Sequence, residues 1–283
     1  MENSGKLYLC ATPIGNLEDI TFRVLRILKE ADLIAAEDTR NSIHLLTHFG
    51  IETPMTSYHE YNKVEKARTL VGKMLSGMTV ALITDAGTPG ISDPGEELVR
   101  QCYEAGVPVT SLPGAAACIT ALTISGLPTR RFAFEAFLPS DKKERSRILD
   151  ELKEETRTMI IYESPHHLKA ALKDLAQCLG EDTKVSVIKE LTKIHEKILR
   201  TTLADAIRFY DVTPPRGEYV LVIEGRSFDE IDSQERADWE ALTVREHMRI
   251  YLDQGMDRKL AMKAVAKDRG LPKSIIYKEL LED

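Results

Sequence analysis

The chain has 283 residues, 43% of them hydrophobic, and a formal net charge of −7. This length corresponds to about two domains with a small addition, and the hydrophobic content excludes a chain that is disordered throughout. No apolar run approaches the roughly 20 residues that span a bilayer. The net negative charge argues against electrostatic binding of nucleic acid by the molecule as a whole, but it does not exclude binding through local basic patches.

The N-terminus and the cysteines predict a cytoplasmic protein that does not enter a membrane. The first residues are polar and lead within a few positions into a predicted strand, which is unlike a signal peptide. The four cysteines are far apart, lie in apolar runs and form no CxxC pair. We therefore expect buried thiols in a reducing compartment.

Short apolar runs alternate with amphipathic helical patterns, which is typical of βαβ units with mostly parallel sheets. The expected fold class is α/β, with two α/β domains. Residues 115–125, a helical pattern of small side chains, separate two series of strands. The strands are predicted at 6–10, 32–36, 79–84 and 107–112 in the first series, and at 132–138, 159–162, 185–189 and 219–224 in the second.

Two helices of this alternating pattern carry clear start and stop signals. Asp93-Pro94 precedes an apolar stripe that ends at Gly106, and Ser164-Pro165 precedes another that ends at Gly180. Proline near a helix start and glycine just past its end follow the usual asymmetry of helix termini. Ser164 is expected to be the N-cap of the second helix.

The sequence after Gly225 changes to a charged stretch and then to helical periodicity without a strand candidate. We therefore predict a separate helical unit at the C-terminal end. The predicted domains are an N-terminal α/β domain at 1–113, a second α/β domain at 114–228 and a helix-turn-helix-like extension at 229–283.

Three loops rich in glycine and proline each follow a predicted strand, where α/β sheets bind ligands. They lie at 11–19 (ATPIGNLED), 85–95 (DAGTPGISDPG) and 112–117 (LPGAAA). Each loop alone is better explained as a tight strand–helix turn, but three such loops at the same strand ends favour a binding cleft. GxxxxGK[ST] and GxGxxG are absent, so neither a Walker-type phosphate loop nor a dinucleotide fingerprint is indicated. An uncharged cleft lined by backbone suits a neutral or cationic adenosyl ligand.

An ordered set of motifs resembles the RNA-modifying branch of the tetrapyrrole methylase superfamily. The motifs are LYLCATPIGNLEDIT, AEDTR, SYHEYN, DAGTPGISDPG, LPGAAA, YESPHHL, ELTKIHE and RGEYVLVIEG, over about residues 6–225. The resemblance implies a class III methyltransferase with S-adenosylmethionine in the cleft between two α/β domains, and a homodimer. It also implies a cytidine 2′-O-methylated in the decoding region of 16S rRNA as the product.

The same resemblance implies the residues that contact the cofactor. The chain departs from the superfamily at Ala86-Gly87-Thr88-Pro89, where other members often read GGDP. The resemblance therefore supports backbone contacts in this loop more directly than a contact to the cofactor carboxylate. By motif position the implied contacts are Asp85, Gly87, Thr88, Ile91, Ser92, Ala116, Ala117, Tyr162, Leu191 and Leu221.

Methylation of a ribose hydroxyl is an in-line displacement that depends on positioning and benefits from a base or a cation near the oxygen. Two polar motifs after short predicted strands supply candidates. His59 is the candidate general base, with Glu60 beside it, and Arg40 would bind a phosphate or orient the ribose. The alternatives are an exposed turn residue for His59 and a helix-start pair for Glu37 with Arg40. We expect no catalytic metal.

Nucleic acid needs a local positive surface, and two segments provide one. Residues 129–147 contain the candidates Arg130, Arg131, Lys142 and Lys143, and residues 256–278 contain Lys263, Lys267, Lys273 and Lys278. The second segment has the pattern of a helix, a turn at Gly270 and a second helix, as in DNA-binding helix-turn-helix motifs. The alternative is a helical hairpin that stabilises a dimer or simply faces solvent. Residues 235–283 balance acidic and basic side chains, so the net negative charge lies in the remainder.

Three functions remain open from the sequence. The first is methylation of a ribose in 16S rRNA of the small ribosomal subunit. The second is C-methylation of a tetrapyrrole or corrinoid precursor, which leaves the basic helical segment unexplained. The third is a non-catalytic RNA-binding ribosome-assembly factor, which leaves the polar motifs around Arg40 and His59 unexplained.

Overall fold

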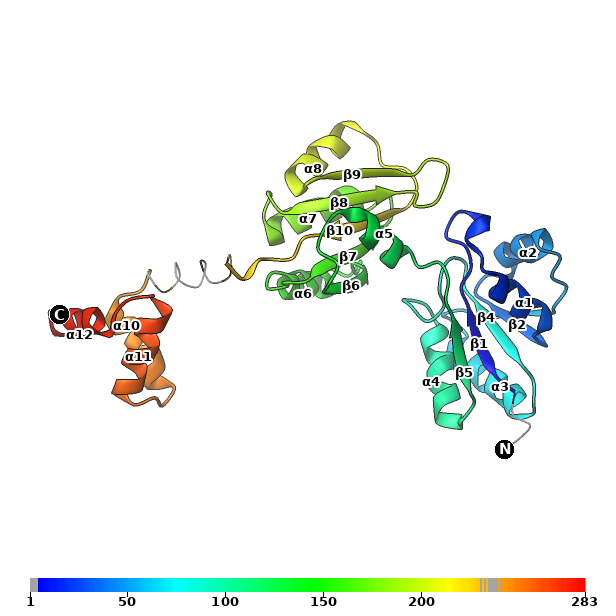
Figure 1. Cartoon of the computed structure of the whole chain (residues 1–283), viewed down its shortest axis with the longest axis horizontal. Coiled ribbons are helices and arrows are strands. Elements are labelled where there is room, and N and C mark those ends of the chain that lie inside the picture. The colour runs from blue at the N-terminus through cyan, green and yellow to red at the C-terminus, as the bar shows by residue number, and fades with distance from the viewer. Residues whose placement is uncertain (1–4, 230, 232, 234–238, 240, 283) are drawn as a thin grey trace. The chain divides into compact units, whose positions relative to one another are not determined.

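The computed structural model describes residues 5–229, 231, 233, 239 and 241–282. The chain forms two compact units (Figure 1). The first comprises Met1–Leu149 with Thr158–Glu224 and contains both β-sheets, and the second comprises Asp150–Arg157 with Gly225–Asp283. Within the described residues, no helix combines the length and the apolar character needed to cross a membrane.

The first sheet is entirely parallel, with strand order β3-β2-β4-β1-β5. Every strand therefore ends at the same edge of the sheet, and the loops that follow the five strands lie along that edge in this order. The strands are β1 (Leu7–Cys10), β2 (Leu33–Ala36), β3 (Met55–Ser57), β4 (Val80–Ile83) and β5 (Val109–Leu112).

Alternating side chains of this sheet enter two separate cores. Leu82 packs in a cluster with residues of α3 and α4, whereas Ile83 packs in a cluster with residues of α1 and α2. Successive side chains of a strand point to opposite faces, so helices cover both faces of the sheet. The helices are α1 (Phe22–Glu30), α2 (Thr39–His48), α3 (Lys63–Leu75) and α4 (Gly95–Ala105), with a short 3-10 helix at Leu17–Asp19.

The second sheet is mixed, with order β6-β7-β10-β8-β9, and the prediction of mostly parallel pairing was wrong for it. Only β6 and β7 are parallel. Seven residues join β8 to β9, too few for the crossover that a parallel pair needs. The strands are β6 (Phe132–Phe137), β7 (Thr158–Glu163), β8 (Lys184–Lys189), β9 (Lys197–Thr202) and β10 (Tyr219–Ile223), and the helices are α5 (Ala117–Ser125), α6 (Lys142–Leu152), α7 (Leu168–Leu179) and α8 (Leu203–Val212).

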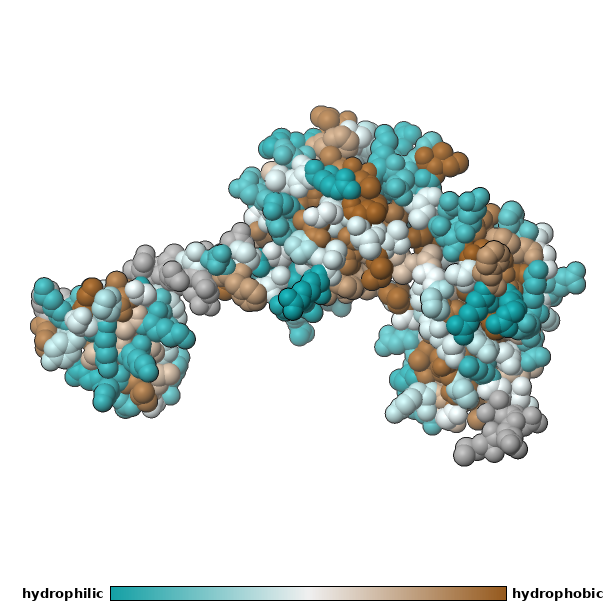
Figure 2. All heavy atoms as spheres, in the orientation of Figure 1, coloured by the Kyte–Doolittle hydropathy of each residue, from teal (hydrophilic) through white to brown (hydrophobic). Residues whose placement is uncertain are grey.

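Among its described residues, the second unit includes the helices α10 (Val244–Asp253), α11 (Arg258–Asp268) and α12 (Lys273–Glu282). Val244, Met248, Val265 and Ile276 form its apolar core. The face seen in Figure 2 carries mostly hydrophilic side chains on these helices. The predicted turn at Gly270 is present, with φ of 63° between α11 and α12.

His247 is buried in this helical unit and stacks on Trp239 with ring centroids 3.9 Å apart. Its Nδ1 accepts a hydrogen bond from Arg269 at 3.2 Å, and the carboxylate of Asp268 lies 3.4 Å from Nε2. Burial lowers the pKa of His247 below its usual 6.5, and the charge of Arg269 acts in the same direction against Asp268. The imidazole is therefore neutral in the folded unit at neutral pH.

The helical unit should lose stability as the pH falls below about 6.5, because the unfolded chain then takes up a proton at His247 that the folded unit does not. Trp239 is the only tryptophan of the chain, so its fluorescence reports on this unit. The denaturant midpoint seen by Trp239 should be lower at pH 5.5 than at pH 7.5. His247→Gln should remove much of this difference, and an equal shift in that variant would contradict the assignment to His247.

Candidate functional site

A cavity of about 480 Å³ lies within the first unit and is lined by loops that follow strands of the first sheet and by strands and loops of the second sheet. Its volume is in the usual range for small-molecule sites. Most of the lining is apolar or small, with a few polar groups. The lining residues are Ile14, Ala86, Gly87, Thr88, Ile91, Ala116, Ala117, Cys118, Phe137, Tyr162, Glu163, Ser164, Pro165, Ile188, Leu191, Glu218, Tyr219 and Val220.

The three glycine-rich loops meet at this cavity through backbone contacts. Thr12 and Gly87 exchange two backbone hydrogen bonds of 2.9 and 3.1 Å, which join the first loop to the second. The hydroxyl of Thr88 donates to the carbonyl of Ala115 at 2.9 Å, which joins the second loop to the third. A Cβ at Gly114 would lie 2.5 Å from the Cβ of Ala11, so glycine allows the third loop to approach the first.

The backbone conformation and the contact with Ile14 both favour glycine at position 87. Its φ is 85°, in the left-handed region that side chains disfavour. A Cβ there would also lie 3.3 Å from Cγ2 of Ile14 and 3.6 Å from the carbonyl oxygen of Ala115. Both neighbours belong to the joined loops, so the backbone forms a close cradle at this side of the cavity.

The structure brings seven of the ten predicted cofactor contacts to the cavity: Gly87, Thr88, Ile91, Ala116, Ala117, Tyr162 and Leu191. The side chains of Asp85, Ser92 and Leu221 do not line it. Leu221 points to the other face of its strand, since Val220 and Val222 pack toward α5. Asp85 instead accepts hydrogen bonds from the Asp38 N–H at 3.2 Å and from the Asn41 amide at 3.1 Å.

Aromatic rings form one wall of the cavity. The ring of Tyr162 packs edge-on against Phe134 and Phe137, with centroids 4.9 and 5.7 Å apart. Its hydroxyl accepts a hydrogen bond from the backbone N–H of Cys118 at 2.9 Å, near the start of α5. Burial raises the pKa of Tyr162, so its phenol stays protonated.

Glu163 and Ser164 also line the cavity, and the sequence did not predict them there. Glu163 is 4% exposed, and burial raises the pKa of its carboxyl, although the charges of His167 and Arg145 oppose the rise. The prediction that Ser164 is the N-cap of α7 was wrong, because His167 takes that position. The buried hydroxyl of Ser164 has no hydrogen-bond partner among the described residues. A ligand in the cavity would meet an unpaired hydroxyl beside a carboxyl group.

The loop after β8 carries Leu191 into the cavity through a strained backbone. Glu190 and Thr192, on either side of Leu191, have φ of 51° and 64°. Left-handed residues other than glycine cost about 1–2 kcal/mol each and concentrate at functional sites. A Cβ at Gly15 would lie 2.5 Å from Cγ of Lys193, so this loop packs closely on the first glycine-rich loop.

The predicted catalytic residues lie at the β3 and β2 end of the same sheet edge, and none of them lines the cavity. Arg40 is exposed and forms an ion pair of 2.6 Å with Asp38. This pairing lowers the pKa of Asp38 to about 2 and raises that of Arg40. Glu60 forms an ion pair of 2.5 Å with Lys63. Hydrogen bonds join the loop after β2 to the glycine-rich loop after β4, because the Thr84 hydroxyl donates to Glu37 at 2.7 Å and Asp85 accepts from the N–H of Asp38.

His59 is held by Asn62 in the loop after β3. The backbone N–H of His59 donates to the Asn62 carbonyl oxygen at 2.9 Å, which orients the Asn62 amide nitrogen toward Nε2 of His59 at 3.2 Å. In this arrangement Nε2 accepts, so the ring proton lies on Nδ1. Nδ1 is buried and has no partner among the described residues.

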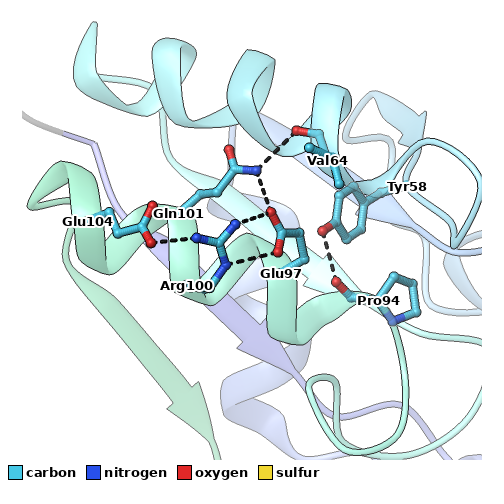
Figure 3. Close-up of polar contacts among 7 residues, drawn as sticks. All are labelled: Tyr58, Val64, Pro94, Glu97, Arg100, Gln101 and Glu104. Atoms are coloured by element: carbon cyan, nitrogen blue, oxygen red, sulfur yellow. Dashed lines mark hydrogen bonds and ion pairs between the residues drawn. The ribbon is translucent and has the colours of Figure 1, made fainter.

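Tyr58 fixes this loop to the start of α4 (Figure 3). Its buried hydroxyl donates to the carbonyl of Pro94 at 2.8 Å. Next to it, the Gln101 amide donates to the Val64 carbonyl at 3.1 Å and to Glu97 at 2.6 Å, so α3 and α4 are joined. Arg100 pairs with both Glu97 and Glu104 on α4. The loop that carries His59 is thereby positioned relative to the glycine-rich loop that precedes α4.

The predicted RNA-binding side chains are all exposed, but they belong to two different units. The first group lies before β6 and at the start of α6, and the second group lies on α11 and α12. The first group is Arg130, Arg131, Lys142 and Lys143, and the second is Lys263, Lys267, Lys273 and Lys278.

Comparison with known proteins places this architecture in a family. The sequence pattern of the family described as Tetrapyrrole (Corrin/Porphyrin) Methylases matches residues 6–207. A solved structure of uroporphyrin-III C-methyltransferase from Thermus thermophilus, complexed with S-adenyl homocysteine, covers 77% of this chain and 97% of its own. Its TM-score is 0.55 at 20% sequence identity, a likeness of fold.

Two relatives are similar over nearly the whole chain. The ribosomal RNA small subunit methyltransferase I of Halalkalibacterium halodurans is 48% identical over 276 residues, 98% of this chain and 94% of that protein. The protein of the same name from Synechocystis sp. is 45% identical over 278 residues, 98% of each chain. The chain therefore belongs to the tetrapyrrole methylase family, and it is a methyltransferase of the group named ribosomal RNA small subunit methyltransferase I.

Proposed function

We propose that the protein transfers a methyl group from S-adenosylmethionine to the ribose 2′-hydroxyl of a cytidine in the decoding region of 16S rRNA. The observation that carries this proposal is the full-length similarity to rRNA small subunit methyltransferases, in a chain whose three glycine-rich loops enclose a largely apolar cavity. The methyl donor supplies an activated methyl group on a sulfonium. The rRNA substrate presents a hydroxyl that must be aligned with it.

The cavity fits an adenosyl ligand in its shape and in its unsatisfied groups. Ala86, Ala116 and Ala117 leave room for a flat ring, and Gly87 lets backbone approach it closely. The unpaired hydroxyl of Ser164 and the carboxyl of Glu163 offer polar contacts, the carboxylate suiting a cationic ligand. The seven predicted residues that line the cavity are proposed to hold the cofactor, together with Glu163, Ser164 and Val220.

The neighbouring polar loops are proposed to bind and orient the ribose. Nε2 of His59 carries the acceptor lone pair of the ring, and it would accept the hydroxyl proton once the ribose replaces the Asn62 amide as its hydrogen-bond donor. Arg40 is exposed and would contact an RNA phosphate, with Asp38 fixing its direction. Glu60 would contact the same substrate from the loop after β3.

The compartment, the oligomeric state, the domain division and the RNA-contacting side chains are proposed as well. The enzyme is proposed to work in the cytoplasm as a homodimer, on rRNA within the small ribosomal subunit. The domain division at 1–113, 114–228 and 229–283 remains the proposed one, with the cofactor between the first two. The basic side chains around α6 and on α11 and α12 are proposed to contact RNA.

The proposed function is tested by incubating the purified protein with tritiated S-adenosylmethionine and three substrates in parallel: small ribosomal subunits, naked 16S rRNA and uroporphyrinogen. Label in ribosomal RNA supports the proposal. Label in uroporphyrinogen would indicate a C-methyltransferase instead. Transfer to none of the three would favour a non-catalytic RNA-binding factor.

Removal of residues 235–283 should weaken binding to small subunits by tenfold or more, which corresponds to about 1.4 kcal/mol, and leave the Kd of S-adenosylmethionine nearly unchanged. The reason is that this deletion removes four candidate phosphate contacts, whereas the cavity lies entirely in the other unit. Filter binding and calorimetry measure the two affinities. An equal loss of both would contradict an RNA-docking role for the helices.

A further inference from the structure

A second cavity, also of about 480 Å³, opens between the start of α6 and the start of α7. Its polar lining is mainly cationic or hydroxylic, with Lys142, Arg145, His167, Ser140 and Ser146. Asp174 is the one carboxylate among its lining residues. Within this lining, lysine and arginine charges therefore outnumber carboxylates, although the chain as a whole is acidic.

The guanidinium group of Arg145 has a hydrogen-bond donor without an acceptor among the described residues. Its Nε donates to Asp174 at 2.7 Å and its Nη1 is 3.5 Å from the Pro139 carbonyl. Its Nη2 is buried and has no hydrogen-bond partner among the described residues. A buried guanidinium N–H without an acceptor is costly, so a rotation of the Arg145 side chain that turned Nη2 toward an anionic oxygen in the cavity would be favourable.

Two carboxyl groups interact with Arg145 at this site: Asp174 accepts from its Nε, and the buried carboxyl of Glu163 lies within reach of its charge. Asp141 turns one carboxylate oxygen to the N–H groups of Lys143 and Glu144, where it caps α6. Lys142 is exposed at the rim. A guanidinium fork, an ammonium group and two hydroxyls together are the donor set that suits a phosphate.

Residues that line this cavity are close in sequence to residues that line the cofactor cavity, at the ends of the two neighbouring strands β6 and β7. Phe137 at the end of β6 lines the first cavity, and Leu138 lines the second. Glu163 at the end of β7 lines the first, and His167, four residues later, lines the second. Because β6 and β7 pair in parallel, both cavities open at the same ends of these strands.

We propose that the cavity of Lys142, Arg145 and His167 binds a backbone phosphate of the RNA, and so sets the register of the strand. This inference rests on the proposed function and makes it more specific, since phosphate contacts position a nucleic acid while the reacting group is selected elsewhere. The positive side chains of α6 would act as one built site rather than as a diffuse basic surface.

The test measures the dependence of RNA affinity on salt for the full-length protein. Lys142→Gln and Ser146→Asp alter the cavity, the second by placing a carboxylate in it. Lys173→Gln on α7 is the matched control, because it removes one exposed positive charge that does not line the cavity. Each variant is compared with wild type for the slope of log Kd against log salt on a 16S rRNA fragment, for the Kd of S-adenosylmethionine and for the Kd of inorganic phosphate.

Loss of one phosphate contact should lower the slope by about 0.7–0.9 in Lys142→Gln and Ser146→Asp, with no change in Lys173→Gln or in cofactor affinity. Unchanged slopes in both cavity variants, or the same decrease in the control, would overturn the inference. Tight binding of inorganic phosphate with an unchanged RNA slope would identify a site for free phosphate and also overturn it. Methyl transfer by wild type to small subunits is scored separately, so failure of the proposed function is distinguished from failure of this site.

Discussion

Replacement of His59 by alanine is expected to lower the rate of methyl transfer to rRNA by about 10²–10⁴-fold, the usual contribution of a general base. The Kd of S-adenosylmethionine should not change, because His59 does not line the cavity. The loop should keep its position, since Tyr58 still donates to Pro94 and Asn62 still accepts from the backbone at residue 59. Single-turnover rates at saturating cofactor and rRNA measure the effect.

His44→Ala is the matched control for this experiment. His44 is an exposed histidine on α2, in the same half of the molecule. The control should transfer methyl groups at the wild-type rate. If His59→Ala and His44→Ala are both as active as wild type, His59 has no catalytic role, and the proton acceptor must be sought among other groups at this sheet edge, such as Glu37.

Replacement of Gly87 by alanine should weaken S-adenosylmethionine binding at least tenfold, or about 1.4 kcal/mol. The added Cβ would lie 3.3 Å from Ile14 at the wall of the cavity. The same substitution should also lower the free energy of unfolding by about 1–2 kcal/mol, because alanine is strained at a positive φ. Calorimetric titration with the cofactor separates the first effect from the second.

Gly90→Ala provides a control with the same backbone strain. Gly90 has φ of 86°, almost equal to that of Gly87, but its Cβ would meet only Leu9, at an ordinary contact distance of 3.8 Å. This variant should lose a similar amount of stability and keep its cofactor affinity. Equal loss of cofactor affinity in both variants would show that loop strain, not the cavity wall, is responsible.

The first sheet was largely predictable because its strands are short, buried runs separated by helices of clear periodicity. Four of its five strands were expected at nearly the observed positions. β3 was expected as a short strand before the motif of His59 but was given no range, since three half-buried residues at the sheet edge give no alternating pattern. β9 was missed for a similar reason, because its exposed and half-buried residues resemble a polar loop.

The direction of strands in the second sheet could not be read from the local pattern. β10 inserts between β7 and β8 and runs antiparallel to both, a long-range pairing that the buried run at Tyr219–Ile223 does not encode. The prediction for this strand was wrong by one residue, and this error changed which side chain was expected to face the cavity. Leu221 was expected at the cofactor, whereas the strand's alternation places Val220 at the cavity.

The glycine-rich half of the cavity was predictable because glycine and small residues that directly follow parallel strands are typical of loops that bind ligands. The other half was not predictable, since Glu163 and Ser164 are equally typical of a helix start. Only the folded chain shows that α7 begins after His167 and that Ser164 faces the cavity with its hydroxyl unpaired among the described residues. A glutamate at the end of an apolar strand, directly before Ser-Pro, was the one signal available.

The position of the transferred methyl group decides whether the protein methylates the ribose of a cytidine in rRNA. Small ribosomal subunits are labelled with tritiated S-adenosylmethionine, and the extracted rRNA is hydrolysed with alkali, which cannot cleave the bond that follows a 2′-O-methylated ribose. We predict that the label remains in an alkali-stable dinucleotide whose methylated residue is cytidine. Label released in a mononucleotide, or on a residue other than cytidine, would contradict the account.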